Sequence, residues 1–443
     1  IYFLFIFLMY NLFTYSQIDS LSYYYEKGEL NKAVKYSEKF KLDKSNSNYV
    51  ELITWKAELN YELGRFEEAI KYYKLIEDNL DNLDNTFSNL KFYRYEIGEA
   101  YFKIGEFNKA EKNFNLHVKE NNDKSLRIIN SIEYLAEIHK VEKDFSRADS
   151  LFQRVIDMRF KEFGKNESYS KSLTLYAQLK KEEKNYLIAE KLLNESIALN
   201  KLIRNDNLAP NVIKALMYKE LNKFDLAEKE FKHIISIDKN KDEFYWKSIT
   251  ELLYLLAEKG EFKEGENLIK TIDLKDIQNY KSKIEVFDSF SYFYYRLNDF
   301  DKYFDYVVEA SNLRLNFYNN DHPEIAKGLN NFAMICKEIG EYDKALEYLY
   351  KALKIHTKIN GENNKLTAVY LKNIGDCYLE LNNFNLSQKS YNAAFNIFIN
   401  DITINHVEFY SLINSLSILY YLNNQHEKAI KLYYDYIINS KNN

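Results

Sequence analysis

The sequence predicts an all-α fold, a right-handed superhelical solenoid of about eleven helical hairpins. Apolar residues recur at helical spacing along nearly the whole chain, and a register of small residues recurs every 36 to 42 residues. The composition agrees, because the 443 residues include only two prolines and eleven glycines, and 46% of them are hydrophobic. A hairpin of this size cannot bury its apolar face alone, so each unit needs stacked neighbours.

The clearest hairpin lies at residues 325–359. Two amphipathic helices are expected to flank Gly340, whose freedom at positive φ suits a tight turn. Ala345 follows this glycine by five residues, and Ala333 precedes Ala345 by twelve, so two small residues fall where the paired helices approach most closely. Asp343 is expected to cap the second helix.

The position of Ala345 has an equivalent in every unit, and we call this position the anchor. The anchors are Ala33, Ala69, Ala110, Ala148, Ala189, Ala227, Gly265, Tyr303, Ala345, Ser387 and Ala429. In ten units an apolar or aromatic residue stands three residues before the anchor. Two residues before it, a polar side chain is expected to cap the second helix in seven units: Asn31, Asn108, Ser146, Asp225, Asp301, Asp343 and Asn385. Tyr303 puts a phenol where a methyl group belongs, so that hairpin must splay or the ring must swing outward.

These features resemble the tetratricopeptide repeat family, whose pattern has a small residue and a tyrosine on the first helix, then an alanine and an aromatic residue on the second. Tyrosines stand at the matching first-helix offset at Tyr24, Tyr101, Tyr218, Tyr294, Tyr378 and Tyr420. The resemblance covers the chain after about Ser20. The family repeat has about 34 residues, and the excess of about four or eight residues here is close to one or two helical turns.

Length alone suggests two or three domains, but the repeats indicate one elongated domain. The expected segments are a signal peptide at 1–16, irregular repeats 1 to 8 at 17–318, and regular 42-residue repeats 9 to 11 at 319–443. The loop Asn-Asn-Asp-His-Pro before Ile325 resembles that of the 42-residue subclass found in kinesin light chains and in bacterial proteins with a CHAT peptidase.

The start of the chain is nearly unbroken apolar sequence, IYFLFIFLMYNLF. As a helix it would span about 20 Å, short of the roughly 30 Å hydrocarbon core, so a secretory signal is favoured over a membrane span. Thr14 and Ser16 suit cleavage before Gln17. Since an initiating Met and a basic leader are missing, we expect a chain truncated at its start. An uncleaved anchor and a buried first helix are the alternatives.

Charge and motifs exclude several classes of function. The net charge is −5 with acids and bases interspersed, so nucleic acid is not expected as a partner. The sequence contains no glycine-rich phosphate loop, HExxH, CxxC or GxSxG motif, so no enzyme activity, cofactor or metal is expected. Cys336 and Cys377 are expected to be buried free thiols.

The candidate binding site is a ladder of polar residues on the first helices of the last three repeats. Its members are Asn330, Asn331, Asn373 and Asn414, with Lys327 and Lys372 close in helical phase. An asparagine amide can hydrogen-bond a peptide backbone whatever its side chains, and the resemblance to kinesin light chains implies such a ladder. In the earlier repeats the equivalent positions form a mixed set that predicts no single ligand: Thr54, Tyr95, Glu133, Thr174, Val212, Thr250 and Asp288.

The leading hypothesis is a non-enzymatic scaffold that is exported to the periplasm or the extracellular space and binds a protein or extended peptide in its concave groove. If residues 1–16 are no signal, the repeats could lie on the cytoplasmic side, and membrane contact is expected only through that segment. The alternative hypothesis is a recruiting or sensory N-terminal part of a longer enzyme, either a CHAT-type peptidase or a membrane histidine kinase. Stacking of like subunits through their ends is a third reading.

Overall fold

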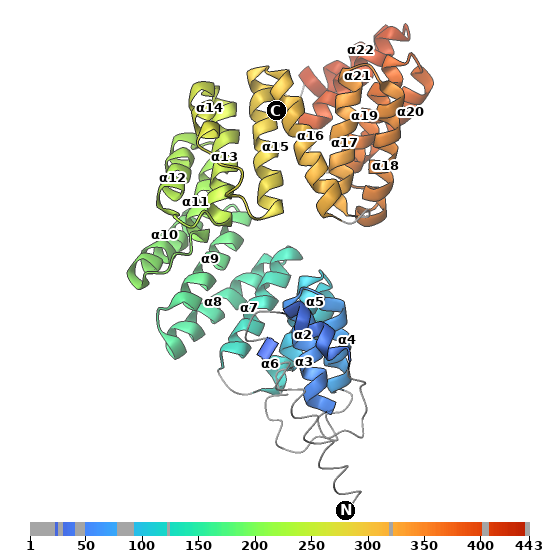
Figure 1. The fold of residues 1–443 in the computed structure, drawn as a ribbon. Coiled ribbons are helices and arrows are strands. Elements are labelled where there is room, and N and C mark those ends of the chain that lie inside the picture. Colours follow the sequence, from blue (N-terminus) through green and yellow to red (C-terminus); the bar gives the residue numbers. More distant parts are fainter. Residues whose placement is uncertain are drawn as a thin grey trace, which may run out of the picture. The chain divides into compact units, whose positions relative to one another are not determined.

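The computed structural model describes residues 23–24, 30–39, 49–77, 93–121, 125–318, 322–400 and 407–438. Within them it contains 21 α-helices, one short π-helix and no β-strand (Figure 1). The all-α prediction is confirmed for this part of the chain. None of these helices combines the length and the apolar character that a membrane span requires. The expected signal peptide at 1–16 lies outside the described residues.

The helices group into two compact units, one up to Met217 and one from Tyr218 onward. The first unit contains α2 (Leu30–Ser37), α3 (Tyr49–Glu62), α4 (Phe66–Glu77), α5 (Tyr93–Lys103), α6 (Phe107–Glu120), α7 (Leu126–Val141), α8 (Phe145–Phe163), α9 (Glu167–Glu182) and α10 (Tyr186–Ile203). The boundary falls within α11 (Ala209–Glu220). The division expected at residue 318 rests on the repeat length and stays a prediction.

The second unit continues the same pattern of paired helices. It contains α12 (Phe224–Ile237), α13 (Glu243–Lys259), α14 (Phe262–Lys270), α15 (Tyr280–Leu297), α16 (Phe300–Phe317), α17 (Pro323–Glu338), α18 (Tyr342–Asn360), α19 (Lys365–Glu380), α20 (Phe384–Asn400), α21 (Val407–Leu422), α22 (His426–Tyr433) and the π-helix η3 (Tyr434–Ile438). Within each unit, helices that follow one another in the chain pack side by side, as in a solenoid.

The predicted anchors lie in the even-numbered helices, which are the second helices of the hairpins. Each of these eleven helices begins three residues before its anchor. All eight anchor alanines are buried, from Ala33 at 0% exposure to Ala429 at 7%. The turn before α18 has the expected geometry, since Gly340 adopts φ +81°. The predicted hairpins are therefore confirmed among the described residues.

The predicted helix caps are wrong by two residues. Asp343 lies inside α18, and the capping position is taken by Glu341, whose side chain makes no capping hydrogen bond. Where capping bonds occur, the acceptor stands four residues before the anchor, as Asp144, Asn185 and Asp299 do. The helix begins at the aromatic residue three before the anchor, so the cap must precede that residue.

The second helices differ in length from repeat to repeat. The second helix α4 has 12 residues, whereas α18 has 19, about two turns more. Whole added turns keep the same face of the helix toward the core. The oversized anchor Tyr303 is only partly buried, and its ring packs 5.5 Å from the ring of Tyr295, at the edge of a hairpin that still closes.

Small residues on the first helices make room for aromatic residues of the second. A Cβ atom added to Gly375 in α19 would lie 2.5 Å from the ring of Tyr391 in α20. Tyr391 is fully buried, and its hydroxyl donates to the carboxylate of Asp376 at 2.8 Å. Burial, followed by the charge of Asp376, raises the pKa of Tyr391, so the phenol remains a neutral donor.

Candidate functional site

Two of the predicted ladder asparagines lie directly beside each other. The Nδ2 group of Asn373 in α19 donates to Oδ1 of Asn330 in α17 at 3.0 Å, across the interface between two repeats. Asn373 is 6% exposed, and Asn330 and Asn331 are partly buried. Asn414, at the corresponding position of α21, is exposed. We call the surface of α17, α19 and α21 that carries these four asparagines the ladder face.

The two predicted lysines are engaged with carboxylates. Nζ of Lys372 lies 3.1 Å from Asp376, four residues further along α19, and Nζ of Lys327 lies 3.2 Å from Asp288 in α15. Lys327 is half exposed, at 52%, whereas Lys372 is 14% exposed. Of these two lysines, Lys327 is therefore the one that presents a cation to solvent.

Asp376 connects neighbouring repeats on the ladder face. Its carboxylate accepts from Tyr391 at 2.8 Å and from Ser415 in α21 at 3.3 Å, and Lys337 of α17 lies 3.4 Å away. One carboxylate thus joins three consecutive hairpins. These bonds hold the first helices at a constant spacing, which a repeated ligand contact requires.

A buried arginine of α16 joins α15 to α17, the first helix of the ladder face. Arg314 in α16 is 0% exposed and donates through Nη1 and Nη2 to the two carboxylate oxygens of Asp288, at 3.0 and 2.5 Å. Its Nε donates to Glu324 of the next repeat at 2.8 Å. Burial acts against its charge, but these bonds outweigh burial and raise the pKa of Arg314. Lys327 approaches the same Asp288 from solvent.

The first unit contains a related arrangement. Arg159 in α8 is 2% exposed, and its Nη2 donates to Glu133 at 3.0 Å and to Asn130 at 2.9 Å. Ser172 of α9 donates to the other oxygen of Glu133, and Asn130 donates to the hydroxyl of Tyr95 in α5 at 3.4 Å. Hydrogen bonds therefore connect first helices of consecutive repeats in this unit as well.

Sequence reasoning missed both arginines, although the sequence contains a signal for them. Arg159 and Arg314 each stand eleven residues after their anchor, and the acids Glu133 and Asp288 each stand fifteen residues before it. The two repeats that have an acid fifteen residues before the anchor are thus the two that have an arginine eleven residues after it. Comparing the repeats for charge pairs, and not only for small residues, would have found them.

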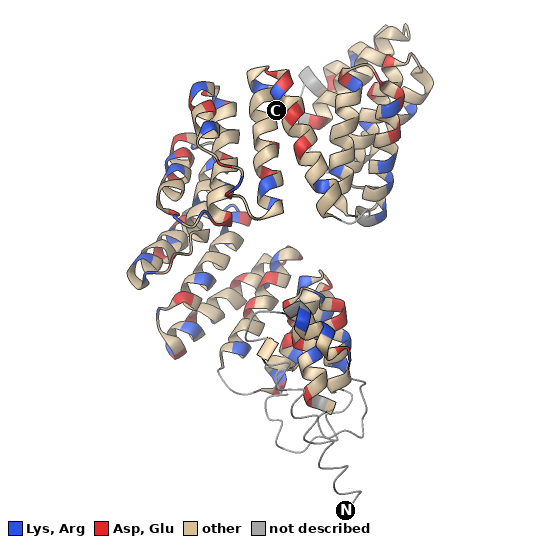
Figure 2. Ribbon diagram, in the orientation of Figure 1, with Lys and Arg blue, Asp and Glu red and all other residues tan. Residues whose placement is uncertain are grey.

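Other clusters of polar residues have internal explanations. Glu228, Glu261 and Glu264 approach one another closely enough to hold a metal ion. Lys232 and Lys259 form ion pairs with these three carboxylates. Two lysines thus already balance most of the negative charge that a cation would need. Figure 2 shows the same mixture of acidic and basic residues along the helices of both units.

The cysteines lie in α17 and α19 as free thiols. Cys377 is buried and Cys336 is partly buried. Burial raises the pKa of the Cys377 thiol to about 11, so it stays protonated at neutral pH and behaves as a small apolar side chain.

Comparison with known proteins identifies the repeats. A family model described as tetratricopeptide repeat matches residues 290–355 and 324–400, and a second model of the same description matches residues 50–76 and 211–241. These segments are tetratricopeptide repeats. The predicted family is confirmed. The matched segments lie near the start and near the end of residues 50–400, which agrees with the anchor register along this range.

Two curated proteins share sequence with these tetratricopeptide repeats. The chain is 23% identical over 372 residues to a TPR repeat-containing protein of Methanocaldococcus jannaschii, a match covering 75% of the chain and 62% of that protein. It is 35% identical over 91 residues to a clustered mitochondria protein homolog of Candida albicans, covering 20% of the chain and 7% of that protein. The chain thus spans less than two thirds of either relative.

Solved structures with a similar fold include BtubC, a putative kinesin light chain and Tom70. BtubC from P. vanneervenii is 18% identical with a TM-score of 0.41, covering 48% of the chain and 87% of that structure. A putative kinesin light chain of Podosopora anserina is 17% identical with a TM-score of 0.37, covering 43% and 95%. Yeast Tom70 is 13% identical with a TM-score of 0.39, covering 96% and 91%.

Proposed function

We propose that this chain is a non-enzymatic scaffold that binds a protein through an extended peptide segment on the ladder face. Solenoids of stacked hairpins present extended surfaces that bind other proteins. The observation that supports this site is the hydrogen bond between Asn373 and Asn330, because it places side-chain amides of consecutive repeats in one line.

The ladder face offers the groups that a peptide backbone needs. An asparagine amide has two N–H donors and an oxygen with two acceptor positions, and the bond between Asn373 and Asn330 uses one donor and one acceptor position. The remaining capacity of Asn330, together with exposed Asn414, suits backbone carbonyl and N–H groups. Half-exposed Lys327 adds a cation, which favours peptides with an acidic residue near it.

Selection of peptides on the full chain tests this function. Random twelve-residue peptides that bind the chain are expected to lose affinity at least tenfold when Asn330 and Asn373 are both replaced by alanine. The matched control is Asn392→Ala, since Asn392 is an exposed asparagine on the second helix α20. Selected peptides that bind the double variant as tightly as the unchanged chain would exclude the ladder face as their site.

Export is part of the same proposal. It is supported by the apolar segment at residues 1–13 with small residues at Thr14 and Ser16. Expression in a bacterial host of the chain with an initiating Met and a short basic leader added before Ile1 is expected to yield periplasmic protein that begins at Gln17. Cytoplasmic protein that still carries residues 1–16 would contradict the proposed export. It would not bear on the proposed binding role.

A further inference from the structure

A buried arginine beside the start of α9 has hydrogen-bond donors that no described residue uses. Arg159 is 2% exposed, and its Nε and Nη1 groups are buried without an acceptor among the described residues. Its Nη2 group donates to Glu133, which also accepts from Ser172 of α9, so the arginine lies beside the first turns of this helix. A buried donor without an acceptor is costly, and native proteins rarely leave one unmatched.

The equivalent arginine of the second unit shows where such an acceptor lies. Nε of Arg314 donates at 2.8 Å to Glu324, which is the second residue of α17. The second residue of α9 is Ser168, at the same distance in sequence from the next anchor. Ser168 ends at its hydroxyl, which donates to Asn166 at 2.8 Å. A serine is too short to reach the arginine as the glutamate does.

The two arrangements also differ by one negative charge. In the second unit, two cations meet two acids: Arg314, Lys327, Asp288 and Glu324. In the first unit, Lys171 stands at the position of Lys327 relative to the next anchor. Lys171 is exposed and forms no ion pair with a described residue. Arg159 is bonded to one acid, Glu133, so two cations share one carboxylate.

The first turn of α9 is suited to an anion. This helix has 16 residues, and the N–H groups of its first turn form the positive end of the helix dipole. Ser168 and Lys171 are three residues apart, so their side chains are neighbours on the helix surface. Glu324, at the position equivalent to Ser168, is 33% exposed, so a group bonded to the buried arginine can be reached from solvent. The adjacent acid Glu167 is exposed and forms no ion pair with Arg159 or Lys171.

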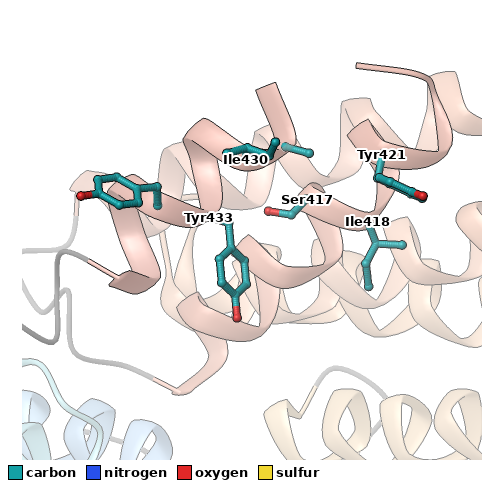
Figure 3. A pocket seen from close by; sticks show the side chains of 7 residues that line it. Ser417, Ile418, Tyr421, Ile430 and Tyr433 are labelled. Atoms are coloured by element: carbon teal, nitrogen blue, oxygen red, sulfur yellow. The ribbon is translucent and has the colours of Figure 1, made fainter. Parts of the chain in front are cut away.

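A groove in the last hairpin lacks these features. It has a volume of about 370 Å³ and is lined by Ser417, Ile418, Tyr421, Ala429, Ile430, Tyr433 and Tyr434 (Figure 3). None of these seven side chains carries a charge at neutral pH, so the groove has no cation for an anion. The start of α9 combines a helix N-terminus, a buried guanidinium group and an exposed ammonium group.

We propose that the start of α9 binds a phosphate group between Nε of Arg159 and the ammonium group of Lys171. The phosphate takes the place that the carboxylate of Glu324 has in the second unit. Its oxygens point in four directions, which suits donors that arrive from α8, from the side of α9 and from the N–H groups of the first turn. The phosphate is either a free ion or part of a phosphorylated side chain of a bound protein. This site is separate from the ladder face and goes beyond the proposed function.

Equilibrium dialysis of the full chain against radioactive inorganic phosphate at constant ionic strength tests the site. One phosphate per chain is expected to bind saturably. Ser168→Glu is expected to weaken binding by about tenfold or more, because its own carboxylate then bonds Arg159. Lys171→Gln is expected to weaken binding by about threefold, as for the loss of one exposed charge.

Two further variants connect the result to the arginine. Ser146→Glu is the matched control, since Ser146 is an exposed serine and the second residue of α8 in the same unit. It is expected to leave phosphate binding unchanged. Glu324→Ser reproduces the arrangement of the first unit beside Arg314 and is expected to raise the number of bound phosphates from one to two.

The source of the phosphate group is distinguished by competition. Displacement of the bound phosphate by O-phosphoserine supports a phosphorylated side chain, whereas displacement by sulfate but not by O-phosphoserine supports the free ion. Absence of saturable binding, or equal binding by the Ser168→Glu variant and the unchanged chain, would overturn the proposal.

Discussion

Replacement of Arg314 by methionine is expected to destabilise the second unit by about 3 to 4 kcal/mol. Arg314 is fully buried and makes three hydrogen bonds to carboxylates, two to Asp288 and one to Glu324. Removal of one partner from a buried ion pair costs about 3 to 5 kcal/mol, because the remaining charge stays desolvated. We expect the lower part of this range, since Lys327 still approaches Asp288 and Glu324 is 33% exposed.

The effect can be measured in the full chain because each unit contains one of the two tryptophans. Trp246 in α13 is 4% exposed and packs in one cluster with Val286 and Phe287 of α15. In a Trp55→Phe background, urea unfolding followed by tryptophan fluorescence therefore reports the second unit alone. The urea concentration at the midpoint of unfolding is expected to fall in proportion to the free energy of unfolding that Arg314→Met removes.

A double variant separates the buried charge from the packing. Asp288→Leu combined with Arg314→Met is expected to recover at least half of the loss, because an apolar pair of similar volume replaces a buried ion pair at little cost. A loss below 1 kcal/mol in Arg314→Met, or the absence of coupling between the two sites, would refute the assignment of this pair as a structural link between repeats.

Three further predictions follow from particular side chains. Relative to the next anchor, Ser168 stands at the position that Glu324 occupies beside Arg314. Nε of Arg159, the equivalent arginine, is buried without a hydrogen-bond partner among the described residues. Ser168→Glu would supply that partner and is expected to stabilise the first unit by about 1 kcal/mol in urea unfolding. Burial, then repulsion by Glu99, raises the pKa of Glu96 from 4.5 to about 7. Between these two pKa values the unfolded chain releases a proton that the folded chain keeps, so the free energy of unfolding falls as pH rises. Glu96→Gln has no such proton to release. Its stability relative to the unchanged chain should therefore rise by up to about 3 kcal/mol between pH 4.5 and 7.5. Iodoacetamide should label the partly buried Cys336 well before the buried Cys377, as followed by mass spectrometry.

Each of these predictions has a control or an opposing outcome. Ser168→Gln adds similar bulk without the charge and should not stabilise the first unit. If it stabilised the unit as much as Ser168→Glu does, the carboxylate would not be the cause. Glu106→Gln changes a half-exposed glutamate and should show no such gain as pH rises. Equal labelling rates of the two cysteines in the native chain would contradict the burial of the second.

The anchor register was predictable because each repeat must place a small residue where its two helices cross, and the same requirement recurs along the whole chain. The helix caps were predicted two residues too late, since an aromatic residue three before the anchor looks like a loop residue while it is already the first residue of the helix. Arg159 and Arg314 were missed because their burial depends on an acid 26 residues earlier, which no local pattern shows.

The candidate site was only partly predictable. Spacing along first helices placed Asn330 and Asn373 near each other, and the hydrogen bond between them agrees with that expectation. The ion pair between Lys372 and Asp376 was missed, although the i, i+4 spacing of opposite charges on one helix indicates such a pair.

The most direct test of the binding role is hydrogen–deuterium exchange of the full chain with and without a peptide selected on it. The account predicts slower exchange in α17, α19 and α21 when the peptide is bound, with little change in α18 and α20. Protection confined to α18 and α20 would contradict it, because the peptide would then lie on the second helices and not on the ladder face.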